Sequence, residues 1–252
     1  MINFVGAGPG AADLITVRGM RLIEEADVII YTGSLVNPEL LAYAKCDPEI
    51  YNSATMTLEE VMDVMLTKDA ERKKIVRLHT GEPSIYGAVR EQMDILDENA
   101  RKYASTPGVS ACFGAAASLN MEYTLPGISQ TLIITRMEGR TPVPDSESIE
   151  SLASHHSSMA IYLSTGMLGV LSERLAAGGL AADTPAAIVY KATWPEEKSY
   201  VCTVSTLEKT AEENGITKTA IVLVGEAVTH MSYDRSKLYD PSFSTGFRDN
   251  TR

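Results

Sequence analysis

Residues 1–14 read MINFVGAGPGAADL, and this stretch decides the fold. Its apolar start is too short for a helix and predicts a buried strand. Three glycines in the next five residues let the backbone turn sharply and approach a ligand closely. Thr16 is placed to cap an amphipathic helix over residues 17–26. The order strand, glycine-rich turn, helix is typical of a nucleotide-type site, although a tight turn that binds nothing has the same pattern.

The first half of the chain alternates expected strands with expected helices. Strands are expected at 27–31, 74–79 and 103–106, and helices at 38–44, 57–70, 88–99 and 112–121. Two of the strands run into further Gly/Pro loops, at 80–87 and 107–111. The alternation predicts a parallel α/β sheet, in which ligands bind beyond the carboxyl ends of the strands. The three loops should therefore converge on one crevice.

The second half predicts a mixed sheet. Strands are expected at 130–136, 159–163, 186–190, 200–204 and 220–224, with helices at 146–154, 168–177 and 206–214. The short spacing between Tyr190 and Tyr200 favours an antiparallel hairpin. The fold class is thus α/β, with an N-terminal lobe at 1–113, a C-terminal lobe at 114–234 and an irregular tail at 235–252.

Composition excludes several classes of protein. The net charge of −11 argues against a nucleic-acid partner, which would need a basic patch. No apolar run reaches the length of a membrane span, and no signal peptide is expected at the N-terminus. Cys46, Cys112 and Cys202 are odd in number and widely spaced, so they predict neither a metal site nor a disulfide framework. Together these features favour a cytoplasmic protein.

A dinucleotide site is the first alternative, because Gly6, Gly8 and Ala11 satisfy the permissive fingerprint. A NAD site also needs an acidic residue at the end of the second strand, where the sequence has Tyr31-Thr32. Pro9 further removes an N–H from the turn that would hold pyrophosphate. A nicotinamide-dependent oxidoreductase is therefore disfavoured.

The three loops resemble those of the tetrapyrrole methylases, which are S-adenosylmethionine (SAM) dependent enzymes of corrin and sirohaem synthesis. The matching stretches are VGAGPG at 5–10 with Asp13-Leu14, GEPSIYG at 81–87 and PGVSA at 107–111. RMEGRTPVP at 136–144, YKATWP at 190–195 and SKLYDPSF at 236–243 resemble the subgroup that methylates C11 of precorrin-4 or cobalt-precorrin-4 in corrin ring (vitamin B12) biosynthesis. The resemblance implies two α/β lobes with the SAM site between them, and a homodimer.

Two positions depart from the family pattern. Thr32 stands where the uroporphyrinogen branch has an acidic residue, which favours a later corrin methylation step. Glu82 stands where the family usually has Asp. Another precorrin methylation step, or a tetrapyrrole carrier without catalysis, remain alternatives, and the sequence does not indicate whether the substrate carries cobalt.

The resemblance also implies which residues contact SAM. They are Pro9, Thr80, Gly81, Glu82, Ile85, Ser110, Ala111, Leu163 and Ala192. Ile85 and Leu163 would form an apolar wall for adenine, although burial habits alone would place both in the core. The sulfonium methyl group is already activated, so alignment, worth about 7–11 kcal/mol, is the main requirement. We identify no catalytic residue and no metal ligand.

The implied substrate is a macrocycle with several carboxylates, which Arg and Lys side chains bind. Five cations in or near the crevice loops are candidates: Arg18, Arg90, Arg136, Arg140 and Lys191. We assign the substrate to Arg136, Arg140 and Lys191, and Thr32 and Ser34 would line the trough. Each of these cations taken singly also fits a solvated surface charge.

The histidines give no clear chemistry. His79 is a candidate base, although a local hydrogen bond explains it more simply. His155-His156 lack further ligands nearby in the sequence, so we interpret them as surface residues rather than as a metal site.

Overall fold

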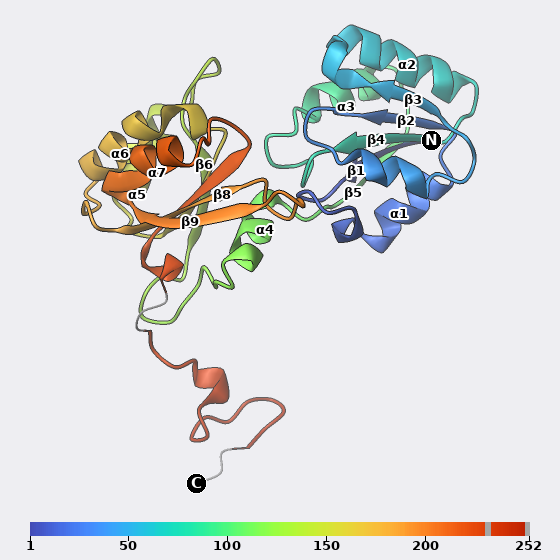
Figure 1. Ribbon diagram of the computed structural model, residues 1–252. Helices are drawn as coiled ribbons and strands as arrows, with labels where there is room; N and C mark the ends of the chain where they lie inside the picture. Colours follow the sequence, from blue (N-terminus) through green and yellow to red (C-terminus); the bar gives the residue numbers. More distant parts are fainter. Residues whose placement is uncertain (230–232, 250–252) are drawn as a thin grey trace. The chain divides into compact units, whose positions relative to one another are not determined.

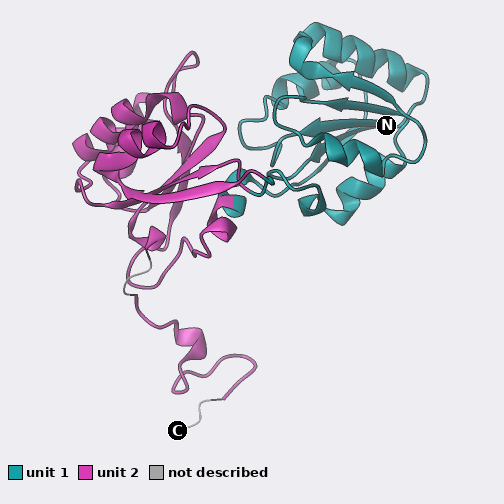
Figure 2. Cartoon of the chain, viewed as in Figure 1, with its two compact units in different colours: residues 1–114, 193–195 teal, residues 115–192, 196–252 magenta. Residues whose placement is uncertain are grey.

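The computed structural model describes residues 1–229 and 233–249. The chain divides into two compact units, shown in different colours in Figure 2. The first unit comprises Met1–Gly114 together with Thr193–Pro195, and the second comprises Ala115–Ala192 and Glu196–Arg252. Three residues from late in the sequence thus belong to the first unit, although the chain on either side of them belongs to the second. The sequence does not predict this insertion.

The first unit is built on a five-stranded sheet with the order β3-β2-β4-β1-β5, and every pair in it is parallel. Its strands are β1 (Ile2–Gly6), β2 (Val28–Tyr31), β3 (Glu49–Asn52), β4 (Ile75–His79) and β5 (Tyr103–Thr106). The predicted parallel sheet is confirmed. Strand β3 was not predicted, because it lies at the edge and its mostly exposed side chains give no apolar run.

Helices cover both faces of this sheet (Figure 1). They are α1 (Val17–Glu24), α2 (Leu58–Ala70) and α3 (Arg90–Glu98), with a 3-10 helix η2 (Pro38–Tyr43) where the sequence predicts a short helix. Ile23 of α1 packs with Val5 and Ile29, whereas Met65 of α2 packs with Phe4. The two cores form because successive side chains of a strand point to opposite faces. Helix α4 (Ala111–Ser118) begins in this unit.

Local capping residues fix the helix starts. The Thr16 hydroxyl accepts a hydrogen bond from Gly19 N at 3.1 Å at the start of α1. Thr57 and Glu60 form the predicted capping box of α2, since each side chain accepts from the backbone N–H of the other.

The second unit contains a mixed sheet with the order β6-β7-β10-β8-β9. Its elements are β6 (Leu132–Arg136), α5 (Ile149–Ala153), β7 (Ser158–Tyr162), α6 (Leu168–Ala177), β8 (Pro185–Tyr190), β9 (Lys198–Thr203), α7 (Leu207–Glu213) and β10 (Ala220–Val224). The predicted hairpin is confirmed, because β8 and β9 pair antiparallel with Tyr190 opposite Lys198. Strands β6, β7 and β8 run in one direction, so their carboxyl ends share one edge.

The segment at the C-terminus carries a short 3-10 helix η8 (Lys237–Tyr239) within the predicted irregular tail. Arg248 Nη2 donates to the carbonyls of Leu238 and Asp240, at 3.0 and 2.8 Å. The last three residues of the predicted tail lie outside the described residues. Within the described part of the chain, no helix has the length and apolar character needed to cross a membrane.

Candidate functional site

The first two Gly-rich loops are joined by their backbones. Gly81 N donates to Gly8 O at 2.9 Å, and Gly8 N donates to Gly81 O at 3.3 Å. Both glycines have positive φ, +82° at Gly8 and +60° at Gly81, which an L side chain adopts only with strain. The loops that follow β1 and β4 therefore lie side by side at the carboxyl edge of the first sheet.

The third loop approaches the other two more closely than side chains would allow. A Cβ atom added to Gly6 would lie 2.5 Å from Gly108 Cα, and one added to Gly108 would lie 2.1 Å from Gly81 O. One added to Gly81 would meet Ser110 Cα at 3.6 Å. The structure thus brings together the first-unit residues for which a SAM contact is predicted: Pro9, Thr80, Gly81, Glu82, Ile85, Ser110 and Ala111.

Glu82 connects the second and third loops through its carboxylate. Oε2 accepts from Gly108 N at 2.8 Å, and Oε1 accepts from Ser84 N at 3.0 Å. Burial opposes ionisation of this carboxyl, but the two N–H donors outweigh it and lower the pKa of Glu82. The side chain therefore positions the loops, a role that the sequence does not indicate.

The predicted SAM residues of the second unit lie at the carboxyl edge of its sheet. Leu163 directly follows β7, and Ala192 follows β8 by two residues. Leu163 is 65% exposed, so the interpretation as a core residue is wrong for it. Leu163 and Lys191 both have left-handed backbone, with φ of +54° and +47°. Strained residues of this kind cluster at functional sites.

The predicted substrate cations differ in how fully they are engaged. Arg136 donates to the carbonyls of Met137, Thr141 and Pro142 at 3.0–3.1 Å. Its guanidinium therefore holds the connection that follows β6, at residues 137–142, in place. Lys191 Nζ lies 3.5 Å from Glu196 Oε2. Arg140 is exposed and makes no hydrogen bond or ion pair with any described residue.

The predicted trough residues belong to the first unit. Ser34 is exposed in the loop after β2. Thr32 Oγ1 accepts from Arg77 Nη1 at 3.5 Å.

Arg77 is a residue that the sequence interpretation missed. It lies buried in β4, donates from Nε to Gln92 Oε1 at 3.2 Å, and pairs with no carboxylate among the described residues. Burial lowers the pKa of Arg77 to about 10. Gln92 Nε2 in turn donates to Ala88 O at 3.0 Å, which ties β4 to the end of the second loop. The signal in the sequence is an arginine within the apolar run IVRLH.

His79 is almost completely buried at the end of β4, 3% exposed and 5.9 Å from the Phe4 ring centroid. Burial, with the charge of Arg77, lowers the pKa of His79 to about 3, so the imidazole is neutral at neutral pH. A hydrogen bond joins it to the backbone of Gly87, while its buried Nε2 has no partner among the described residues. This setting favours the local hydrogen bond over a role as base.

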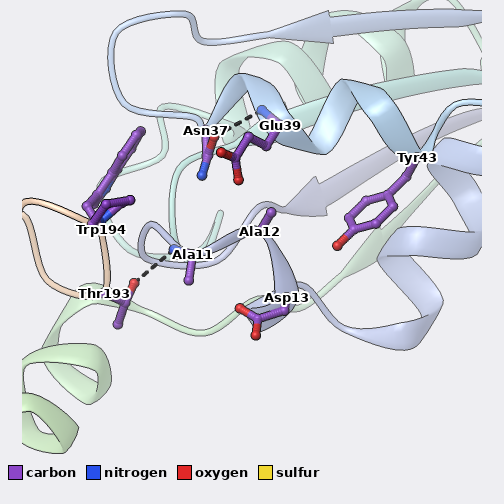
Figure 3. A pocket seen from close by; sticks show the side chains of 9 residues that line it. Ala11, Ala12, Asp13, Asn37, Glu39, Tyr43, Thr193 and Trp194 are labelled. Carbon is purple, nitrogen blue, oxygen red and sulfur yellow. Dashed lines mark hydrogen bonds between the residues drawn. The ribbon is translucent and has the colours of Figure 1, made fainter.

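A pocket of about 400 Å³ opens beside the first loop (Figure 3). Asn37 Nδ2 donates to Gly10 O at 2.9 Å, Trp194 Nε1 donates to Pro9 O at 3.2 Å, and Ala11 N donates to Thr193 Oγ1 at 3.0 Å. The lining residues are Ala11, Ala12, Asp13, Asn37, Glu39, Tyr43, Thr193, Trp194 and Pro195. Two of them are acidic and none is basic, so this pocket does not suit the carboxylates of a tetrapyrrole.

Comparison with known proteins identifies the family. The family model described as Tetrapyrrole (Corrin/Porphyrin) Methylases matches residues 1–208. The chain belongs to this family. It is 51% identical over 247 residues to the cobalt-precorrin-4 C(11)-methyltransferase of Methanocaldococcus jannaschii, covering 98% of this chain and 95% of that one. The predicted membership of the tetrapyrrole methylases is therefore confirmed.

Solved structures of tetrapyrrole methylases share the fold. An X-ray structure of a cobalamin biosynthetic enzyme, cobalt precorrin-4 methyltransferase, matches with a TM-score of 0.88 at 43% identity, over 90% of this chain and 95% of that one. The uroporphyrin-III C-methyl transferase of Thermus thermophilus, complexed with S-adenyl homocysteine, matches with a TM-score of 0.73 at 23% identity, over 90% and 98%. The predicted two-lobed α/β fold, with one parallel and one mixed sheet, is confirmed.

Proposed function

We propose that this chain transfers the methyl group of SAM to C11 of cobalt-precorrin-4. The observation that carries the proposal is the similarity, over 98% of the chain, to a cobalt-precorrin-4 C(11)-methyltransferase. The products are cobalt-precorrin-5, S-adenosylhomocysteine and a proton: the S–CH₃ bond breaks, a C–CH₃ bond forms at C11, and the electron pair comes from the ring.

The three joined loops suit the donor. SAM supplies a sulfonium methyl group that is already activated for in-line displacement. The chain's task is to hold the donor in line with the acceptor carbon, which is worth about 7–11 kcal/mol in reactions of this kind. Gly8 and Gly81 carry no side chains, so a ligand can lie closely against the joined backbone of the two loops. Ser110 and Ala111 stand beside Gly81 at the start of α4.

Substrate recognition is assigned to cations and hydroxyls outside the acidic pocket. Arg140 offers an unengaged guanidinium for a bidentate bond to a substrate carboxylate. Lys191 would exchange its contact with Glu196 for a substrate carboxylate. Arg136 acts by shaping the connection that presents Arg140. Thr32 and Ser34 line the substrate side of the first unit.

The test is turnover of purified enzyme with SAM and cobalt-precorrin-4. We expect a product heavier by one methylene unit and an equal amount of S-adenosylhomocysteine. A parallel reaction with metal-free precorrin-4 decides which form of the ring is preferred. Binding of the tetrapyrrole without methylation would favour a carrier, and binding of NAD in place of SAM would favour the oxidoreductase.

We further propose that the enzyme works as a homodimer, as the family resemblance implies, and that it works in the cytoplasm, which the odd number and wide spacing of its cysteines favour. Sedimentation velocity of the purified chain measures its oligomeric state, and we expect twice the chain mass of 27.2 kDa. Fractionation of the native cell tests whether the enzyme lies in the cytoplasm. A monomer at micromolar concentration that is fully active would contradict the dimer.

A further inference from the structure

We propose that Thr193 and Trp194 are positioning residues, which hold the turn at residues 9–11 in the shape that receives the methyl donor. The inference rests on the proposed function, because that function assigns this turn to the donor.

The turn depends on bonds from outside itself. Pro9 has no N–H, so the turn has one backbone donor fewer for hydrogen bonds of its own. Trp194 Nε1 binds Pro9 O at 3.2 Å, and Thr193 Oγ1 accepts from Ala11 N at 3.0 Å. Asn37 supplies the third side-chain bond, to Gly10 O. Two consecutive residues therefore hold both ends of the turn.

The remaining carbonyls around the turn are bonded by the backbone. Gly8 O accepts from Gly81 N, and Ala11 O accepts from Leu14 N at 3.1 Å. With the bonds from Trp194 and Asn37, all four carbonyls of residues 8–11 have a donor. Loss of either residue of the 193–194 pair would leave one backbone group of the turn unpaired, and the turn would relax to satisfy it.

The backbone at Thr193 has an unusual conformation at the point where it contacts the turn. Its φ is +68°, a conformation that is an outlier for a β-branched residue and persists only where the surroundings fix it. Thr193 packs closely with the turn, since a Cβ added to Gly114 would lie 3.0 Å from Thr193 Cγ2 and 3.2 Å from Pro9 Cβ. Thr193 and Trp194 belong to the insertion Thr193–Pro195, which groups with the first unit.

Trp194 also supplies a direct readout, because it is the single tryptophan of the sequence. Its indole N–H is bonded to the turn itself. We expect S-adenosylhomocysteine to change the tryptophan emission of the wild-type enzyme in a saturable way, with the same dissociation constant that calorimetry gives.

The decisive comparison is between Thr193→Val and Thr193→Ser. Valine keeps the shape and loses the acceptor oxygen, whereas serine keeps the oxygen. We expect Thr193→Val to weaken binding of S-adenosylhomocysteine about tenfold, as loss of one partly buried hydrogen bond does, and to raise KM for SAM more than it lowers kcat. Thr193→Ser should bind within about threefold of wild type. Trp194→Phe, which lacks the N–H, should behave like Thr193→Val in calorimetry.

The matched control is Thr57→Val. Thr57 Oγ1 accepts from Glu60 N at 3.3 Å, so this variant also removes a threonine acceptor from a backbone N–H, but at the start of α2. We expect a lower melting temperature and unchanged affinity for S-adenosylhomocysteine. Equal affinity of folded Thr193→Val and wild type would overturn the positioning role alone. A wild type that does not bind S-adenosylhomocysteine would overturn the proposed function and this inference together.

Discussion

At Gly6 and Gly108 the backbones of two loops come so close that neither position has room for a Cβ atom. Gly8 and Gly81 are glycines for a second reason, because their positive φ angles would strain any side chain. Sequence reasoning finds these positions because glycine is itself the signal. It does not assign a role to Arg77. The charged residue is visible inside an apolar strand, but its partners, Gln92 and Thr32, are far away in the sequence and cannot be predicted from it.

Gly81→Val should abolish detectable binding of S-adenosylhomocysteine while the protein stays folded. A β-branched side chain at φ +60° is strained by roughly 1–2 kcal/mol and would disturb the paired bonds with Gly8. Calorimetry measures the affinity, and circular dichroism the fold.

Gly215→Val is the matched control for this change. Gly215 has φ +65° and nothing within 4 Å of an added Cβ, so it carries the same strain away from the loops. We expect it to lose stability and keep its affinity. Unchanged affinity in Gly81→Val would remove the second loop from the donor site.

His79 should make the free energy of unfolding depend on pH. The pKa of His79 is lowered from 6.5 to about 3 by burial and by Arg77, so the unfolded chain binds a proton that the folded chain does not. Stability from this group is complete above pH 6.5 and is lost as the pH falls toward 3, by about 1.4 kcal/mol per pH unit. Urea unfolding across this range measures the slope.

His79→Gln should reduce that slope, and His155→Gln, at an exposed position, should leave it unchanged. Equal slopes for wild type and His79→Gln between pH 6.5 and 4 would show that the imidazole titrates normally in the folded chain.

At the scale of the elements, the sequence predicts most of both sheets correctly because the strands are buried apolar runs and the helix starts carry capping residues. Helix α6 lies where predicted, and so does the capping box of α2. Strand β3 was missed because its pairing, and not its composition, makes it a strand. The predicted helix after residue 38 is the 3-10 helix η2. The convergence of the three loops was predicted from the parallel order of the strands, while the Glu82 bond between two of them was not.

Glu82→Gln should loosen the second and third loops. An amide offers one acceptor oxygen where the carboxylate accepts from both Gly108 N and Ser84 N, so we expect a loss of about 1–2 kcal/mol in unfolding free energy and weaker binding of S-adenosylhomocysteine. Because the pKa of Glu82 is lowered in the folded chain, the difference from wild type should shrink as the pH falls below about 4.5.

The exposed Glu98 on α3 provides the comparison. Glu98→Gln should match wild type in both urea unfolding and calorimetry. If Glu82→Gln and Glu98→Gln were indistinguishable in both measurements, Glu82 would not join the second and third loops as we propose.

At the scale of the molecule, each unit has its own hydrophobic core. The two sheets are those expected for the tetrapyrrole methylase family, to which the chain belongs. The chain order alone does not reveal that Thr193–Pro195 groups with the first unit, because a short connection between β8 and β9 has no apolar pattern to place it.

S-adenosylhomocysteine at a hundred times its dissociation constant should raise the free energy of unfolding by about 2.7 kcal/mol, as expected for a ligand that binds only the folded chain. NAD at the same concentration should leave the melting temperature unchanged. Thermal unfolding followed by calorimetry measures both, and stabilisation by NAD without stabilisation by S-adenosylhomocysteine would reverse the assignment of the donor.

The late insertion into the first unit has a consequence for synthesis on the ribosome. Residues 1–114 emerge first, yet the unit that they form lacks Thr193–Pro195 until more than three quarters of the chain has been translated. The first unit is thus complete only after residues 115–192 of the second unit have been synthesised. A gene truncated after residue 114 would yield an N-terminal fragment in which the turn at residues 9–11 has lost two of its three side-chain hydrogen bonds.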